Sequence, residues 1–482
     1  MEFRNLTPVD ALAFTNIDTS NREYHIVLIK AGYLLRPMRD RGDDVPTHCS
    51  FSGRQLTHFP VLLEGEGDED MGLPGAVSLV LADEYIGEVG KTSVKAESDL
   101  APYRPRCDVV IQGHTYAPST KPMTNWTARV RLSVPPATNP VAEQAEVQPL
   151  NPMMGLSQEQ LESQRRMATP KAAEPRILLD KKLEICGSRF FNRSAGAWRM
   201  TPPEPAASCA LLWEHAFGGN CQVPNPDAQT AEAKPFLLNE ACYTNPIGCG
   251  WYDKRWPDAL KKAHGALPKQ LPAPRIAYSL AAIADISVSL QPEITAPQGY
   301  EHRQMAEVAK DYAIKPAGFG WVGRTSVPRI NYTGTHDASW QEKRWPGLPE
   351  DFDFAYWNGA PADQQIEFPT PNFTLELLNF TKPIYPDAGI PSDAGTYLAA
   401  QMPGHRALVL IRTQDGLMLP MPMTIDTVVF DTELMQVNVT WRVGILKSVD
   451  ARVLEARLER NPKAPLLRIR DPNDESREVS YG

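Results

Sequence analysis

Three carboxylates that lie close together in the chain, Glu350, Asp351 and Asp353, are the residues whose types and spacing could do chemistry. A pair of carboxylic acids is the catalytic apparatus of most glycoside hydrolases, which use one as an acid and the other as a base or nucleophile. Nearby aromatic side chains could stack on sugar rings; these are Trp345, Tyr356 and Trp357. The sequence therefore allows a carbohydrate-active or other hydrolytic enzyme.

The same carboxylates have a second interpretation, in which they cap turns or pair with arginines. Aspartate side chains commonly accept hydrogen bonds from backbone N–H groups in turns. Arginines of the same segment that could pair with them are Arg324, Arg329 and Arg344. We favour this second interpretation, and with it a protein that has no catalytic residues.

A glycine pattern typical of dinucleotide-binding proteins occurs as Gly318-x-Gly320-x-x-Gly323. That fingerprint needs a strand before the first glycine and a helix that begins at the last, so that the helix N-terminus meets the pyrophosphate. Residues 301–313 instead form a polar, helix-like stretch, and Pro328 interrupts any regular helix after the pattern. We interpret the pattern as a glycine-rich turn with buried aromatic side chains, and we expect no cofactor.

The histidines and cysteines show no spacing typical of a metal site or a nucleophile. The nine histidines are dispersed, and Cys242 and Cys249 have no second pair beside them. Neither H-E-x-x-H nor G-x-S-x-G occurs in the sequence. We therefore expect no metal ion.

Composition and charge exclude several classes of protein. The formal net charge of −9, from 49 basic and 58 acidic residues, argues against a general nucleic-acid binder. No apolar run approaches the roughly 20 residues that span a bilayer, so no membrane insertion is expected. Residues 1–6 lack the features of a signal peptide, and the seven cysteines never form C-x-x-C. These features predict a cytoplasmic protein with reduced thiols.

Patterns typical of strands dominate both ends of the chain, and 45 prolines against 31 glycines predict many irregular connections. Residues 125–134 alternate between apolar and polar side chains, which indicates a half-buried strand. Residues 423–441 predict a hairpin that turns at residues 431–433. Further strands are expected at residues 24–35, 107–111, 177–186, 372–379 and 407–412.

The expected fold is mainly β, with sandwich-like packing of N-terminal and C-terminal strands, a long loop-rich central region and few short helices. Four regions are predicted: an N-terminal β region (1–134), a linker or insertion (135–175), a central loop-rich region (176–365) and a C-terminal β region (366–482). Regular elements expected inside the middle regions are residues 157–166, 277–290 and 301–313.

Several short motifs, taken in order, resemble a bacterial family, domain-of-unknown-function family 2169. They are SDLAPYRP (98–105), DVVIQGH (108–114), WEHAFGG (213–219), NPIG (245–248), GFGWVGR (318–324), PR (328–329), GTHD (334–337), RWP (344–346), LPEDFD (348–353), AP (360–361), DQQ (363–365), IDTVV (425–429) and TWR (440–442). The resemblance extends from about residue 20 to residue 445. The chain departs from the family mainly at residues 135–175, which resemble a private insertion.

Members of this family accompany type VI secretion genes, and the resemblance implies an adaptor or chaperone. Such a protein would bind a type VI effector, typically one with a PAAR-like domain, and help to load it onto the VgrG spike without catalysis. A structural component of the secretion apparatus is a further alternative. Candidate scaffold or partner-binding residues are Trp213, Phe217, Asn245, Phe319, Trp321, Arg324, Arg329, Trp340, Arg344, Trp345, Asp353 and Gln364.

Overall fold

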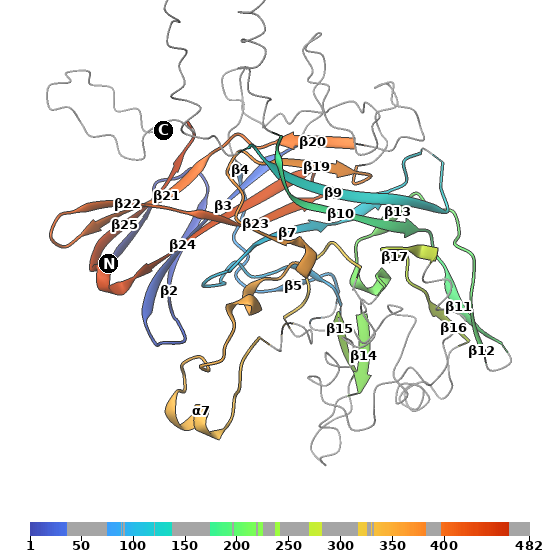
Figure 1. Ribbon diagram of the computed structural model, residues 1–482, viewed down its shortest axis with the longest axis horizontal. Coiled ribbons are helices and arrows are strands. Elements are labelled where there is room, and N and C mark those ends of the chain that lie inside the picture. Colours follow the sequence, from blue (N-terminus) through green and yellow to red (C-terminus); the bar gives the residue numbers. More distant parts are fainter. Residues whose placement is uncertain are drawn as a thin grey trace, which may run out of the picture.

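Strands make up most of the regular structure of the protein, which we describe from a computed structural model (Figure 1). The structure describes residues 1–35, 75–136 except 88, 90, 91 and 120, 174–217 except 195 and 196, 220–224, 237–241, 269–281, 317–381 except 325–328, 330 and 331, and 397–461. Within these ranges the few helices are short. The predicted mainly β fold class is confirmed.

A seven-stranded sheet combines strands from both ends of the chain, in the order β18–β7–β23–β24–β3–β2 with β4 beside β3. These strands are β2 (Asp10–Ile17), β3 (Glu23–Leu34), β4 (Gly75–Ala76), β7 (Cys107–Gln112), β18 (Gln365–Ile366), β23 (Thr424–Asp431) and β24 (Gln436–Leu446). β7 and β23 are parallel, whereas the other neighbours are antiparallel. The sheet therefore requires both the N-terminal and the C-terminal strands.

Two further sheets pack around this one. A five-stranded sheet has the order β17–β10–β9–β19–β20, and a four-stranded sheet has the order β1–β25–β21–β22. Their strands are β1 (Glu2–Asn5), β9 (Asn125–Val134), β10 (Arg176–Cys186), β17 (Ile276–Ala277), β19 (Thr374–Leu378), β20 (Tyr397–Gln401), β21 (Arg406–Thr413), β22 (Met418–Pro422) and β25 (Ala451–Glu459).

Smaller sheets and short helices complete the described regular structure. The remaining strands are β5 (Glu84–Tyr85), β6 (Val94–Ala96), β8 (His114–Tyr116), β11 (Phe190–Ser194), β12 (Ala197–Met200), β13 (Ser208–Ala210), β14 (Asn220–Pro224), β15 (Leu237–Ala241) and β16 (Gln270–Pro272). The helices are α7 (Ala338–Lys343) and the 3-10 turns η1 (Trp213–His215), η4 (Phe354–Trp357), η5 (Ala362–Gln364) and η7 (Lys447–Val449). No helix within the described ranges is both long and apolar enough to cross a membrane.

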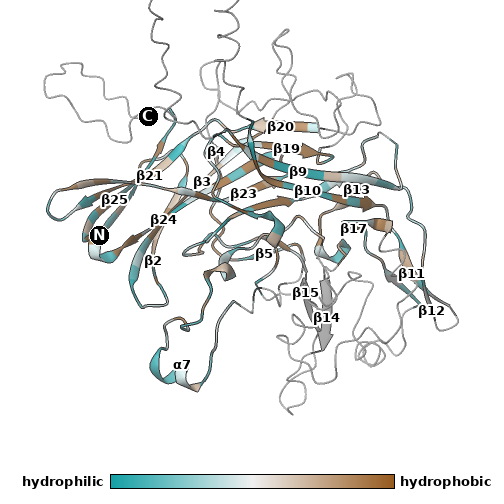
Figure 2. Cartoon of the chain, in the orientation of Figure 1, coloured by the Kyte–Doolittle hydropathy of each residue, from teal (hydrophilic) through white to brown (hydrophobic). Residues whose placement is uncertain are grey.

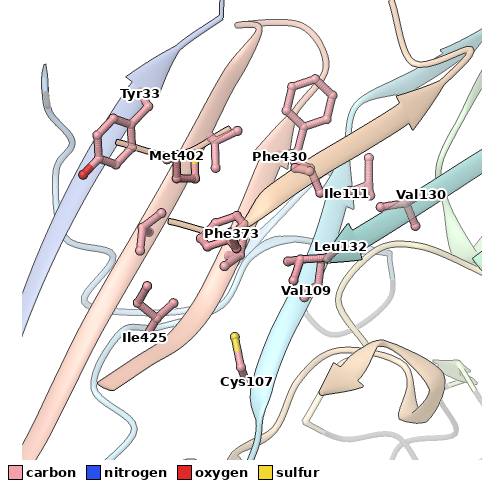
Figure 3. Close-up of a cluster of buried hydrophobic side chains, with 14 of the residues drawn as sticks. Tyr33, Cys107, Val109, Ile111, Val130, Leu132, Phe373, Met402, Ile425 and Phe430 are labelled. Atoms are coloured by element: carbon pink, nitrogen blue, oxygen red, sulfur yellow. The ribbon is translucent and has the colours of Figure 1, made fainter. Parts of the chain in front are cut away.

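One continuous hydrophobic core joins the three large sheets. Successive side chains of a strand point to opposite faces, so Val109 and Ile111 of β7 meet Leu132 of β9 in this core (Figure 3). Figure 2 shows apolar residues concentrated on these central strands, whereas α7 is mostly hydrophilic. Each large apolar side chain buried here stabilises the fold by about 1.5–3 kcal/mol.

The opposite face of the seven-stranded sheet carries charged side chains. Asp108 of β7 is fully buried there, and Lys30 of β3 forms an ion pair of 2.8 Å with Asp99. The segments that supply partners for these side chains are residues 97–106 and 317–366. This covered polar face positions the site.

The structure tests several of the predicted elements. The strand at residues 125–134 and its alternation are confirmed, because its even-numbered side chains from Trp126 to Val134 are buried. The predicted hairpin corresponds to β23 and β24, which are paired from Asp431 and Gln436 onward. Residues 157–166 and 301–313, Asn245, most of residues 277–290 and nearly all of the predicted insertion lie outside the described residues.

Candidate functional site

The family-like segment at residues 317–366 divides into two parts with different surroundings. We call residues 317–324, Arg329 and residues 354–366 the anchored part, because many of them bond to β7 and to the residues just before it. Residues 332–353 form the arm, which carries α7 and projects away from the sheets in Figure 1.

Lys181 of β10 joins the two ends of the anchored part. Its ammonium group is buried and donates hydrogen bonds to the carbonyl of Gly318, to Asp363 at 2.8 Å and to Gln364 at 2.7 Å. The Gln364 amide in turn donates to the carbonyls of Val109 at 2.6 Å and Phe319 at 2.9 Å. Gln364 and Phe319 are therefore buried scaffold residues.

Trp213 explains the first glycine of the Gly318-x-Gly320-x-x-Gly323 pattern. A Cβ atom on Gly318 would lie 2.7 Å from the Trp213 indole, so only glycine allows this close approach. The Trp213 Nε1–H donates to the carbonyl of Trp321 at 2.6 Å, and both tryptophans are buried. Phe217 is partly buried and packs against the same core. The pattern therefore serves aromatic packing here, as the sequence interpretation proposed.

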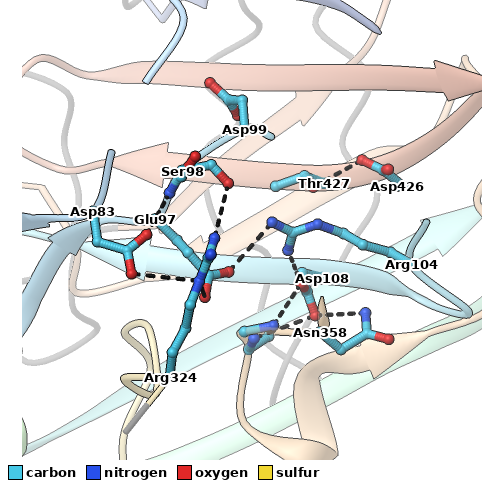
Figure 4. Close-up of polar contacts among 12 residues, drawn as sticks. Asp83, Glu97, Ser98, Asp99, Arg104, Asp108, Arg324, Asn358, Asp426 and Thr427 are labelled. Atoms are coloured by element: carbon cyan, nitrogen blue, oxygen red, sulfur yellow. Dashed lines mark hydrogen bonds and ion pairs between the residues drawn. The ribbon is translucent and has the colours of Figure 1, made fainter. Parts of the chain in front are cut away.

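Glu97 is a buried carboxylate that contacts three arginines (Figure 4 shows two of them). Arg329 donates to it directly, Arg104 Nη2 lies 3.3 Å away, and Arg324 Nε lies 3.2 Å away. Burial opposes the ionisation of Glu97, but the charges of Arg329, Arg104 and Arg324 outweigh it and hold its pKa below the ordinary glutamate value. Glu97 therefore fastens the anchored part to the loop that precedes β7.

Asp108 is the second buried carboxylate that holds the anchored part against the sheet (Figure 4). Its carboxylate accepts hydrogen bonds from Arg104, from the Asn358 side chain at 3.0 Å and from the backbone N–H groups of Gly359 at 2.8 Å and Ala360 at 3.2 Å. Burial raises the pKa of the Asp108 carboxyl above its ordinary value, although the charge of Arg104 and these hydrogen-bond donors oppose the shift. The sequence offered one signal that was missed, an aspartate in the otherwise apolar run 107–111.

The arm has its own small aromatic centre. Asp337 caps α7 by accepting from the backbone N–H of Trp340 at 2.8 Å. The Trp340 ring lies edge-on to His336 and to Trp345, with centroid distances of 4.5 Å and 5.6 Å. Its Nε1–H donates to the carbonyl of Gly347 at 2.9 Å. Trp345 itself is 68% exposed.

Arg344 fixes the orientation of the arm on the turn between β2 and β3. Its guanidinium donates to the carbonyl of Thr19 in that turn and to the carbonyl of Leu348 at 2.9 Å. It also forms an ion pair of 2.8 Å with Glu350. The exposed Trp345 is therefore presented by a braced loop.

The three carboxylates near the tip serve as caps and an ion-pair partner. Asp351 accepts from the backbone N–H of Thr335 at 2.8 Å and from its hydroxyl at 2.7 Å, and the backbone donor in particular lowers its pKa. Asp353 accepts from the N–H of Ala355 at 2.8 Å, and Glu350 pairs with Arg344. All three are exposed, as expected for turn caps.

The structure thus separates the predicted site residues into three groups. Buried residues, all of the anchored part or its neighbours, are Trp213, Phe319, Trp321, Arg329 and Gln364. Partly buried residues are Phe217 and Arg324 at the anchored part, and Trp340 and Arg344 in the arm. The exposed members are Trp345 and Asp353. Sequence reasoning missed the central roles of Glu97, Arg104 and Asp108. Within the described ranges no cluster of three or more His, Cys, Asp or Glu side chains could hold a metal ion.

The fold and the site define a β-rich protein whose family-like segment is fixed by a buried ionic network. The chain belongs to the family described as "Uncharacterized protein conserved in bacteria (DUF2169)", whose model matches residues 63–146 and 162–442. The match begins later than the expected residue 20, and its gap falls inside the predicted insertion. No curated protein and no solved structure matches the chain.

Proposed function

We propose that the protein is a non-catalytic adaptor of type VI secretion that binds an effector with a PAAR-like domain and helps to load it onto the VgrG spike. The observation that carries the proposal is the arm, which holds an exposed tryptophan on a braced loop away from the sheets. Tryptophan and arginine dominate the binding energy of many protein interfaces. A rigid contact loses less entropy on binding than a flexible one.

Other parts of the molecule are consistent with this role. The exposed carboxylates Glu350, Asp351 and Asp353 act as caps or ion-pair partners, so they lend the alternative hydrolase no support. Loading would precede secretion, which suits a cytoplasmic protein. The type VI context itself comes from the family resemblance.

The proposal is tested by co-expressing the chain with the PAAR-like effector encoded beside it. We expect a co-purifying complex, a higher soluble yield of the effector, and at least tenfold weaker binding by Trp345→Ala. Leu434→Ala is the matched control, because Leu434 is 62% exposed and lies at the opposite end of β24 from the turn that braces the arm. An effector that is soluble and delivered without the protein would contradict the proposal.

A further inference from the structure

The strand β2 ends the seven-stranded sheet beside β3 (Figure 1). It pairs with β3 from Asp10 to Ile17 without a register shift. No described strand pairs with its other side. An edge strand presents backbone N–H and C=O groups that form a template for one more strand. The free side of β2 is therefore a place where another extended chain can bind.

The hydrogen bonds beside β2 show which of its backbone groups face outward. The N–H of Asp18, the residue after β2, donates to the carbonyl of Arg22 at 3.0 Å. It therefore faces the neighbouring strand of the hairpin. In an antiparallel pair, successive residues alternate between facing the neighbouring strand and facing away from it. The residues of β2 whose backbone groups face outward are therefore Ala11, Ala13, Thr15 and Ile17.

Local side chains satisfy outward-facing groups at both ends of β2. At the end near the turn, the N–H of Ile17 donates to Asn16 Oδ1 at 2.7 Å. At the other end, Val9 lies two residues before Ala11, and its carbonyl accepts from the Asn5 side chain at 2.7 Å. The edge is therefore closed at these two points by the chain itself.

The open part of the edge lies between these points and consists of Ala11, Ala13 and Thr15. Within the described ranges, no backbone group of these three residues has a hydrogen bond to a segment other than β3. Thr15 is exposed and the two alanines are partly exposed, so another chain can reach this edge. Each of the three residues can donate one hydrogen bond and accept one.

The edge strand β22 of the four-stranded sheet shows how this protein closes an edge. The N–H of Met423, directly after β22, donates to the carbonyl of Ala407 at 3.0 Å. By the same alternation, the backbone nitrogens of Pro420 and Pro422 face outward. Proline has no N–H to donate, and outward-facing prolines block the addition of a strand. β2 contains neither proline nor lysine, so its edge has none of this protection.

The sequence of β2 is complementary to itself when two copies run antiparallel about Ala13. The residues that would face each other are Ala11 and Thr15, Leu12 and Phe14, and Asp10 and Asn16. No pair brings together two charges of like sign. Leu12 and Phe14 are partly exposed and would cover each other, and such cross-strand pairs stabilise sheets.

The backbone groups are complementary in the same arrangement. Ala13 would exchange both of its hydrogen bonds with Ala13 of the second copy, and Ala11 would do so with Thr15. Every open N–H and C=O group of the edge then has a partner. The alternation of small and apolar side chains therefore selects a second copy of this chain as the occupant of the edge.

We infer that the chain forms a two-fold symmetric dimer in which the β2 strands of two copies pair antiparallel about Ala13 and join their seven-stranded sheets. A two-fold axis is the commonest symmetry of soluble oligomers. One short strand pair makes a small interface, so the dimer should dissociate in the micromolar range. The inference does not depend on the adaptor function.

Sedimentation velocity of the full chain, from low micromolar to millimolar concentration, tests the dimer. Ala13→Pro should weaken dimerisation at least about tenfold, because it removes the central N–H donor of both copies. That N–H faces outward, so the substitution leaves the pairing with β3 in place. Ala13→Ser is the matched control, because it keeps the donor, and it should stay within about threefold.

A second pair of variants tests the register of the two strands and covers the case that Ala13→Pro does not fold. Asn16→Asp places two carboxylates opposite each other at both ends of the pair, and it should weaken dimerisation about fivefold at low salt. Adding Asp10→Asn to Asn16→Asp restores a neutral partner and should recover dimerisation to within about twofold of the natural chain.

Hydrogen exchange of the peptide that covers residues 10–17 locates the interface. Its amides should exchange more slowly in concentrated than in dilute solution. A chain that stays monomeric at every concentration overturns the inference, as does Ala13→Pro that dimerises as well as Ala13→Ser. Protection that is equal at the lowest concentration would mean that a segment of the same chain fills the edge. Protection of a monomer only on addition of the effector would mean that the effector supplies the strand, and both results contradict the dimer.

The dimer and the adaptor function fail separately. A monomeric chain that binds the effector removes only the dimer. A dimer that Ala13→Pro dissociates, in a chain that never binds the effector, removes only the adaptor.

Discussion

The anchored part and the arm come from one family-like segment and share its residue types, yet they are stabilised in opposite ways. In the anchored part, Arg329 and Gln364 bond to groups as many as 232 and 255 positions away in the chain, and their side chains are buried. In the arm, most bonds span 16 positions or fewer, although Arg344 also reaches the distant turn between β2 and β3. Similar composition can therefore build either a scaffold or a presented surface, and the position of the partner groups decides which.

The largest expected difference between the two parts concerns their glutamates. Glu97→Gln removes the carboxylate shared by three buried arginines, and breaking such a buried ionic group costs about 3–5 kcal/mol. Glu350→Gln removes an exposed partner of Arg344 and should cost less than about 1 kcal/mol. Equilibrium unfolding in guanidinium chloride measures both values, and equal losses would remove the distinction between the two parts.

The tryptophans give the next comparison. Trp213→Ala should destabilise the protein by about 3–5 kcal/mol, because it leaves a cavity against Gly318 and frees the Trp321 carbonyl. Trp345→Ala should change stability by no more than about 0.5 kcal/mol, since its side chain is largely in water. Melting temperatures of both variants test this prediction. A large loss of stability in Trp345→Ala would show that the arm also supports the fold.

The smallest expected effect concerns pH. The loss of folding stability caused by Glu97→Gln should depend on pH. The pKa of Glu97 is lower in the folded protein than its ordinary value of 4.5, so its stabilisation is complete above about pH 4.5 and is lost as the pH falls toward the folded pKa. The stability difference between the natural protein and Glu97→Gln should therefore shrink on acidification. Unfolding curves at several pH values below neutrality measure it. A difference that grows would mean that Glu97 is protonated in the folded state.

Local patterns were enough to predict much of the fold. The alternation of residues 125–134 gave both the bounds and the buried face of β9, and the hairpin of residues 423–441 placed the turn correctly between β23 and β24. These elements obey a period of two and are bounded by turn residues, which is information held within a few positions. The loop-like texture of residues 318–365 was likewise recognised.

The candidate site was harder to predict than the fold, because its contacts join residues that are far apart in the sequence. Glu97 and Arg329 are ordinary charged residues in the sequence, and nothing at short range shows that they meet. Asp108 and Asp426 each interrupt an apolar strand, and that break in pattern was the available sign of a buried charge. Which half of the family-like segment faces solvent could be learned only from the fold.

The pairing of β3 with β24 has a consequence for the synthesis of the protein. Glu23 and Lys447 form an ion pair across 424 positions of sequence, so β3 leaves the ribosome long before its neighbour exists. At about 20 residues per second that delay is roughly 20 s. During this interval the apolar edge of β3 has no partner strand, and such non-local pairing slows folding. Fragments that stop before Gln436 should therefore aggregate, and the protein is better dissected by point substitution than by truncation.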